Sequence, residues 1–290
     1  MKVSGFTFIR NAIKLDYPIV EAIRSILPLC HEVIVAVGNS NDETLQLVQG
    51  IDPKIKVIET VWDDSLRKGG QVLADETNKA FKAISEDTHW AIYIQGDEVM
   101  HEDYYDNIRH AMTKHASDEN IDGLLFNYRH FYGSYDYVGD ALQWYPKEIR
   151  IIKNNPNIYS FGDAQGFKKE NGKKLNVAQI NAHIHHYGWV KSPAAMQRKQ
   201  ESFHKLWHDD QWMKKNIAKA DEFDYSEVKA LWKFKGSHPK IMKDRISKKG
   251  WTFDHDISRN TFSKKERFKK WAQRLTGLPL GEYQNYKIVK

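Results

Sequence analysis

The sequence is poor in cysteine and in long apolar runs. Cys30 is the one cysteine among 290 residues, so no disulfide can form within the chain, which fits a reducing compartment. It stands in an apolar stretch and is interpreted as a small core residue rather than a nucleophile. No run approaches the ~20 apolar residues that a membrane-spanning helix needs. The first residues also lack the apolar segment of a signal peptide, so we expect a cytoplasmic protein.

Two phosphate-binding motifs are also absent. The sequence contains neither the G-x-x-x-x-G-K-[ST] loop of P-loop NTPases nor the G-x-G-x-x-G turn of dinucleotide-binding domains. The loop from Lys68 to Gln71 contains two glycines and could approach a phosphate, but it matches neither pattern. The sequence therefore argues against a P-loop NTPase and against an NAD-dependent dehydrogenase.

The chain has enough apolar residues for a sizeable core and a surplus of positive charge. Hydrophobic residues make up 41%, aromatic residues 12%, and the formal net charge is +6. Exposed aromatic rings stack on sugar rings and on bases, although a tryptophan-rich core explains them equally well. A basic surface attracts nucleotides, acidic glycans, nucleic acids or anionic lipids, and charge alone does not choose among these.

Apolar runs alternate with helical patterns through the first 120 residues, which predicts a mostly parallel sheet flanked by helices. The expected strands are Lys2–Ile9, His31–Val37, Lys54–Glu59, Trp90–Ile94, Gly123–His130, Glu148–Lys153 and Asn181–Tyr187. The expected helices in the first part of the chain are Asp16–Leu29, Glu43–Gln49, Gln71–Ile84 and Tyr104–His115. Ligands of such sheets bind at the carboxyl ends of the strands. The loops at Arg10–Asn11, Gly38–Asp42 and Gln95–Glu98 should therefore share one edge.

Three groups of residues could carry chemistry. Asp97 and Glu98 follow a buried strand, where carboxylates could hold a hard divalent cation against a diphosphate, or could simply form a solvated loop. His183, His185 and His186 stand close together, and imidazole is a ligand for manganese, zinc or iron; the alternative is a packed, half-buried histidine cluster. Asp163, between two glycines, could act as a general base or merely shape a turn.

Several segments carry a recognisable pattern: FTFIRNA (Phe6–Ala12), EVIVAVGNSNDET (Glu32–Thr44), the helix Gln71–Phe81 and YIQGDE (Tyr93–Glu98), and further on WYPKEIRIIKN, DAQGF and HHYGWVKSP. These segments resemble those of the family 2 glycosyltransferases, which have the Rossmann-like GT-A fold. The resemblance covers roughly residues 2 to 200. Three positions depart from the family pattern, because Asn39 and Gln95 stand where the family has acids and Thr77 stands where it has an arginine.

The resemblance implies a bacterial, metal-dependent, inverting transferase that takes a sugar from a nucleotide-sugar donor to a hydroxyl acceptor. Mn²⁺ or Mg²⁺ would be the cofactor, held by Asp97, Glu98 and His186, and Asp163 would be the base. The acceptor would be a glycan, an envelope polysaccharide or a lipid-linked molecule. The donor-contacting residues that the resemblance implies are Phe8, Arg10, Asn11, Asn39, Asp42, Asn78 and Gln95.

We divide the chain into a GT-A domain (1–200), with a donor half at about 1–120 and an acceptor half at about 121–200, and a basic helical C-terminal extension (201–290). The segment Ser263–Leu275 has apolar residues on one side and cations around them. It could lie on an anionic membrane surface, giving peripheral contact at the inner membrane face, or dock with a solvated basic face. No nucleic-acid partner is expected, because no binding motif is recognised.

The sequence is also compatible with three other functions. The fold could serve a catalytically inactive protein that binds a nucleotide-sugar or a glycan. It could serve a nucleotidyltransferase, which would consume a nucleoside triphosphate and release pyrophosphate. The basic tail could also belong to a nucleic-acid adaptor, whose affinity should fall steeply with salt.

Overall fold

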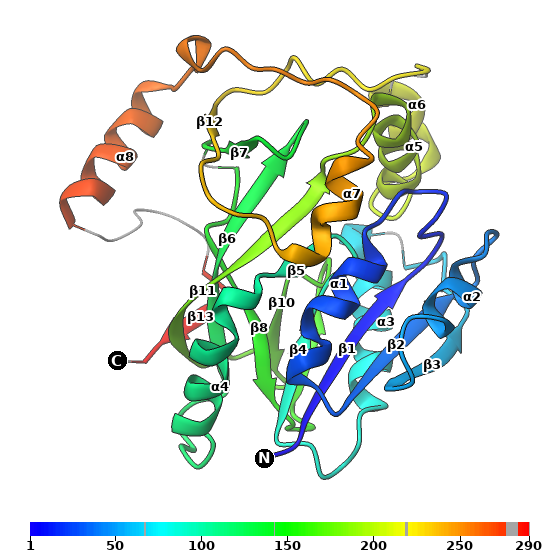
Figure 1. The fold of residues 1–290 in the computed structure, drawn as a ribbon, viewed down its shortest axis with the longest axis vertical. Coiled ribbons are helices and arrows are strands. Elements are labelled where there is room, and N and C mark those ends of the chain that lie inside the picture. The colour runs from blue at the N-terminus through cyan, green and yellow to red at the C-terminus, as the bar shows by residue number, and fades with distance from the viewer. Residues whose placement is uncertain (67, 142, 218–219, 277–283, 290) are drawn as a thin grey trace.

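The computed structural model describes residues 1–66, 68–141, 143–217, 220–276 and 284–289 (Figure 1). Its helices are α1 (Ile19–Ile26), α2 (Thr44–Gln49), α3 (Gln71–Lys82), α4 (Tyr105–Lys114), α5 (Pro193–His204), α6 (Asp210–Asn216), α7 (Lys243–Ser247) and α8 (Lys264–Thr276). Its strands are β1 (Val3–Ile9), β2 (Glu32–Gly38), β3 (Ile55–Thr60), β4 (Trp90–Tyr93), β5 (Glu98–Met100), β6 (Gly123–Tyr132), β7 (Tyr137–Gly139), β8 (Lys147–Lys153), β9 (Ile158–Phe161), β10 (Gly166–Lys169), β11 (Leu175–Trp189), β12 (Leu231–Lys233) and β13 (Tyr286–Ile288).

One large sheet organises the molecule, and the expected α/β class is confirmed. The strands β3, β2, β1 and β4 lie side by side in that order and are all parallel. Beyond β4 the sheet becomes mixed, because β8 runs antiparallel to both β4 and β6. The parallel half brings the carboxyl ends of β1, β2 and β4 to one edge, as the sequence predicts.

The strands of the parallel half are buried on both faces. In β2, Val33, Val35 and Val37 belong to one apolar cluster, whereas Ile34 and Ala36 belong to the other, because successive side chains of a strand point to opposite faces. The first cluster includes the apolar residues of α1 and α4, and the second includes those of α3. Helices therefore cover both faces of the sheet (Figure 1), which explains why β2 is a continuous apolar run.

The long strand β11 joins the late part of the chain to this core. It runs parallel to β6 and antiparallel to β5. Its register places His186 opposite Glu98, and the backbone N–H of Tyr187 donates to the carbonyl of Asp97 over 2.7 Å. The histidine segment is thereby held against the loop that follows β4.

The part of the chain from residue 201 onward differs from the helical extension that the sequence predicts. It contains α6, α7 and α8, but also β12, which pairs with β7, and β13, which pairs with β11. Irregular segments connect them. Buried apolar side chains such as Leu231 and Tyr286 anchor these strands to the sheet, so tertiary packing overrides the helical pattern here. Within the described ranges, no helix combines the length and the apolar character that a bilayer crossing demands.

Candidate active site

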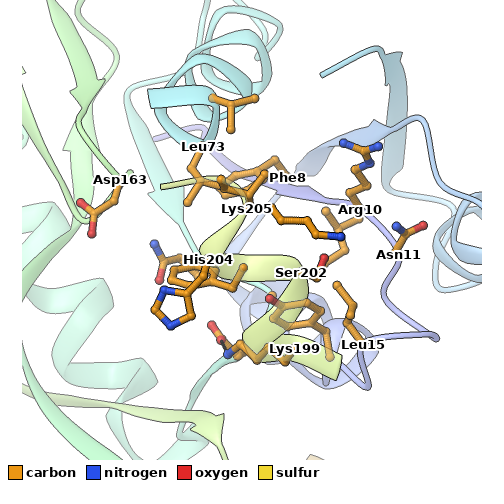
Figure 2. Close-up of a pocket in the computed structure, with 18 of the residues that line it drawn as sticks. Phe8, Arg10, Asn11, Leu15, Leu73, Asp163, Lys199, Ser202, His204 and Lys205 are labelled. Atoms are coloured by element: carbon orange, nitrogen blue, oxygen red, sulfur yellow. Dashed lines mark hydrogen bonds and ion pairs between the residues drawn. The ribbon is translucent and has the colours of Figure 1, made fainter. Parts of the chain in front are cut away.

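A cavity of about 680 Å³ opens at the carboxyl ends of β1 and β4. The end of β1, the loop after β4, the β9–β10 loop, the start of α3 and the helix α5 all contribute to its wall. Figure 2 shows Asp163 on one side of the cavity and Arg10 and Asn11 on the other, with His204 and Lys205 between them. Of the residues predicted from the sequence, the cavity is lined by Phe8, Arg10, Asn11, Gln95, Asp97, Asp163 and His186.

Four predicted site residues do not line the cavity. Asn39 accepts the backbone N–H of Trp62 at 3.3 Å, and Asp42 accepts the N–H groups of Lys14 and Thr44 at 2.8 and 3.1 Å. The Asn78 side chain is paired with both backbone groups of Ser160, at 2.7 and 2.9 Å. These three side chains bind backbone groups of neighbouring segments and do not line the cavity. Glu98 is the fourth.

Glu98 is a structural residue in this arrangement. It is fully buried and bound to Arg150 through two hydrogen bonds of 2.7 and 2.8 Å. Tyr128 donates a further hydrogen bond at 2.8 Å and the backbone N–H of Gln95 another at 3.1 Å. Both carboxylate oxygens are therefore occupied, and the expectation that Glu98 is a metal ligand is corrected: its place inside a buried ion pair leaves no oxygen for a cation.

Asp97, its neighbour, points into the cavity instead. Its Oδ2 accepts a hydrogen bond from the Lys199 ammonium at 3.0 Å, and its Oδ1 lies 3.6 Å from Nε2 of His186. Burial acts to raise the pKa of Asp97, but the charge and the hydrogen bond of Lys199, together with neighbouring positive charges, hold the pKa well below its usual range. Asp97 is therefore ionised at neutral pH.

A chain of hydrogen bonds fixes the tautomer of His186. His130 Nε2 lies 2.8 Å from the carbonyl oxygen of Tyr145 and must donate to it, so Nδ1 of a neutral His130 is an acceptor. His186 Nδ1, 3.2 Å away, then carries the proton that this acceptor receives. Burial lowers the pKa values of both His130 and His186, which keeps both rings neutral. The remaining nitrogen, Nε2 of His186, is left with a lone pair beside the Asp97 carboxylate.

This donor set fits a divalent cation. One carboxylate oxygen and one unprotonated imidazole nitrogen face each other across 3.6 Å, and Mn²⁺ accepts both ligand types, while substrate phosphates commonly complete the coordination of such ions. Asp97 and His186 would hold the ion, without Glu98. Another group of possible ligands among the described residues, His101, Glu102 and Asp103, lies outside the cavity. There, His101 Nδ1 accepts the backbone N–H of Asp103 and Nε2 pairs with Ser237.

Asp163 is held at the tip of the β9–β10 loop. The next residue, Ala164, is fully buried with φ of 62°, a conformation rare for residues other than glycine. Gln95 anchors this turn by donating from its side chain to the carbonyl of Ala164 at 3.1 Å. Gly70, in the glycine loop before α3, packs against Asp163 so closely that a Cβ there would stand 3.1 Å from the aspartate Cβ. Burial raises the pKa of Asp163, as suits a general base.

The nucleotide-facing side that the sequence predicts contains an aromatic pair. The rings of Phe8 and Trp62 lie 5.9 Å apart, and the Arg10 guanidinium stands 5.4 Å from the Trp62 ring. Asn11 adopts φ of 54° and its side chain accepts the backbone N–H of Asn41 at 2.8 Å. A planar aromatic base could stack on such a surface, since every base presents a π face.

Several residues that line the cavity were not predicted from the sequence, chiefly Trp62 and, on and after α5, Lys199, His204 and Lys205. The segment of α5 shows a helical pattern, but nothing in a single sequence indicates that this helix covers a cleft. The Pro193 that opens α5, with Ser192 capping it, was the available signal for where the helix starts.

The sequence matches no family model and no curated protein. Solved structures with a similar arrangement of strands and helices include residues 1–349 of TarS from S. aureus, at 15% identity and a TM-score of 0.42. The match covers 70% of this chain and 64% of that one, so the chain spans less than two thirds of its length. Structures of the same TarS fragment in complex with UDP and with UDP-GlcNAc are similar as well.

Two further structures are similar at lower TM-scores. The 4-diphosphocytidyl-2C-methyl-D-erythritol synthase of Anaerococcus prevotii has 11% identity and a TM-score of 0.39, over 66% of this chain and 91% of that one. Glucosyl-3-phosphoglycerate synthase of Mycobacterium tuberculosis, in complex with Mn²⁺, UDP and phosphoglyceric acid, has 18% identity and a TM-score of 0.29. That match covers 45% of this chain and 43% of the other.

Proposed function

We propose that the protein is a glycosyltransferase that moves a sugar from a nucleoside diphosphate donor to a hydroxyl group of an acceptor. The observation that carries the proposal is the composition of one cavity. It brings together a carboxylate–imidazole pair, Asp97 and His186, and a separate half-buried carboxylate, Asp163, at the carboxyl ends of parallel strands. Leaving-group stabilisation and base catalysis are the two needs of sugar transfer, and these groups supply one each.

The donor would lie across the floor of the cavity. The base and ribose would contact Phe8, Trp62, Arg10 and Asn11, and the diphosphate would reach Asp97 and His186. A divalent ion held there, Mn²⁺ or Mg²⁺, would neutralise the charge that develops on the diphosphate. Asn39, Asp42 and Asn78 would support this side through the backbone contacts described above, without touching the donor.

Asp163 would act on the acceptor. The acceptor oxygen attacks the anomeric carbon and forms the new C–O bond, while its proton passes to the Asp163 carboxylate. The bond between the anomeric carbon and the diphosphate oxygen breaks, and the nucleoside diphosphate leaves with the electron pair. Attack from the side opposite the leaving group inverts the anomeric centre. The acceptor class that we propose is a glycan or a lipid-linked molecule.

A donor screen followed by turnover tests this function. Nucleoside diphosphates and their sugars, with UDP and UDP-GlcNAc among the first, are measured by calorimetry with and without Mn²⁺, and hydrolysis or transfer is followed by release of the nucleoside diphosphate. We expect one nucleotide family to bind and Asp97→Ala to abolish turnover. Substantial activity in Asp97→Ala would contradict the role of this carboxylate.

The same measurement separates the alternatives. Donor binding without turnover, in the presence of Mn²⁺ and a panel of hydroxyl acceptors, would indicate a nucleotide-sugar or glycan-binding protein. Consumption of a nucleoside triphosphate with release of pyrophosphate would indicate a nucleotidyltransferase. Binding of no nucleotide under any condition would overturn the proposal.

A further inference from the structure

A lysine from the late part of the chain lines the cavity beside Asp97. Lys199 lies on α5 and only 8% of its surface is exposed, yet it lines the cavity. Figure 2 shows it below His204 and Ser202, among the residues that converge on the open space. Burying an ammonium group is costly unless its charge is paired, so we expect the N–H groups of Lys199 to have hydrogen-bond acceptors.

The partners present account for two of its three N–H groups. Lys199 donates to Asp97 Oδ2 at 3.0 Å and to the carbonyl oxygen of Gly188 at 2.8 Å. Its ammonium also lies 5.1 Å from the centre of the Tyr17 ring, which is a favourable distance for a cation–π contact. An ammonium has three donors, so among the described residues one N–H of Lys199 has no hydrogen-bond acceptor.

A second buried lysine, Lys191, stands near Asp97 and Lys199. Lys191 is fully buried nearby, with its ammonium donating to the carbonyl of Asp16 and lying 4.7 Å from the centre of the same Tyr17 ring. Burial lowers the pKa of Lys191 to about 7, so at neutral pH it adds a partial positive charge next to the Asp97–Lys199 ion pair. A ligand that brings negative charge of its own would favour the charged form of Lys191.

The residues around Lys199 are closely packed. A Cβ on Gly188 would lie 2.6 Å from Asp97 Oδ2 and 2.7 Å from Cε1 of His186. The glycine therefore permits the aspartate, the histidine and the lysine to converge on one point. Since Lys199 holds Oδ2 of Asp97, Oδ1 is the oxygen left to face His186.

We propose that the Lys199 ammonium is a built-in cation for the diphosphate of the donor, so that a nucleoside diphosphate binds this site without a divalent ion. The inference rests on the proposed function, because it concerns the same donor site. Charge-assisted hydrogen bonds to phosphate are short and strong. Lys199 is already in place where the diphosphate of the proposed donor would lie, so no metal ion has to bind first. A divalent ion on Asp97 and His186 would then add to binding instead of being required for it.

The test must separate this role from simple pairing with Asp97. Replacing Lys199 alone would leave the buried Asp97 carboxylate without its charge partner. The comparison is therefore made in the Asp97→Asn background, which has neither the carboxylate ligand of the metal site nor a negative charge for Lys199 to pair with. Binding of UDP, GDP, ADP, CDP and dTDP is measured by calorimetry in EDTA for Asp97→Asn, for Asp97→Asn with Lys199→Met, and for Asp97→Asn with Lys199→Arg. The corresponding nucleosides serve as probes that lack phosphate, and thermal unfolding checks that each variant is folded.

We expect the nucleoside diphosphate that binds Asp97→Asn in EDTA to bind the Lys199→Met double variant at least about tenfold more weakly, with the Arg variant intermediate. Binding of the nucleoside should not change. Equal affinity of Asp97→Asn and the Lys199→Met double variant for the diphosphate would overturn the inference, and so would binding by the wild type that appears only when Mn²⁺ is added. Absence of nucleotide binding both in EDTA and with Mn²⁺ would instead contradict the proposed function itself.

Discussion

At the scale of single residues, adjacent side chains in this site have opposite roles. Asp97 faces the cavity, whereas Glu98 is sealed in an ion pair with Arg150. We expect Glu98→Gln to lower the free energy of unfolding by about 3–5 kcal/mol, because it leaves a buried guanidinium without its charge partner. Urea denaturation measures the change, and the exposed Glu119→Gln is the control. A loss of metal affinity in Glu98→Gln at unchanged stability would show that Glu98 is a ligand after all.

Asp163 makes the second prediction at this scale. A base must be ionised, and burial raises the pKa of Asp163, so kcat/KM should fall with decreasing pH through a limb that lies above the usual range for an aspartate. Asp163→Asn should reduce turnover about 100-fold or more and remove the limb, while donor affinity is kept. Asp210→Asn, which changes another aspartate that lines the cavity, should keep the limb of the pH profile. An unchanged pH profile in Asp163→Asn would assign the base elsewhere.

At the scale of elements, α8 is the clearest candidate for contact with a surface. Phe268, Trp271 and Leu275 are 60%, 58% and 67% exposed, at a spacing that puts them on one side of the helix, and Lys264 and Lys265 are exposed as well. Figure 1 shows this helix at the margin of the molecule. An apolar stripe beside cations is typical of helices that lie on anionic membranes.

We therefore predict that the protein binds vesicles containing phosphatidylglycerol and that added salt weakens the binding. Changing Phe268, Trp271 and Leu275 together to serine should reduce vesicle binding about tenfold or more, because each side chain contributes roughly 1.5–3 kcal/mol when it is buried. Cosedimentation measures it, with Trp232→Ala, an exposed aromatic residue on β12, as the control. Equal binding by the triple variant and the wild type would favour the alternative, a helix with a solvated basic face.

At the scale of the whole molecule, buried histidines make stability depend on pH. Burial lowers the pKa values of His130, His185 and His186, and it lowers that of His183 to about 4. The unfolded chain takes up protons on these residues near pH 6.5, whereas the folded chain does not, so stability is full above that value and is lost as the pH falls below it. Each fully buried histidine contributes a slope of about 1.4 kcal/mol per pH unit.

Thermal unfolding between pH 8 and pH 5 checks this, and we expect the melting temperature to decrease progressively below about pH 6.5. His130→Asn should make the decrease shallower. A melting temperature that stays constant or rises as the pH falls would mean that these rings are protonated in the folded protein, and the tautomer assigned to His186 would then be wrong.

Sequence patterns predict much of the fold and part of the site. The apolar runs that alternate with helical patterns, and the polar residues after β1 and β4, place Arg10, Asn11 and Asp97 at one edge, because parallel strands share a direction. The sequence could not separate Asp97 from Glu98, since the partner that buries Glu98 lies 52 positions away. Lys199 was out of reach for the same reason: its role depends on how α5 packs, and periodicity describes a helix without saying what it faces.

The position of β11 in the sheet has a consequence for synthesis. The strand that carries His186 is paired with segments made 50 to 90 residues earlier, and the helix that carries Lys199 follows it. A nascent chain that has completed β1 to β6 already possesses the aromatic pair and Asp97, yet it holds neither the imidazole nor the ammonium. While the ribosome is still adding the later residues, the growing polypeptide therefore lacks part of the cavity wall, and the complete cavity forms only when the second half of the chain has emerged.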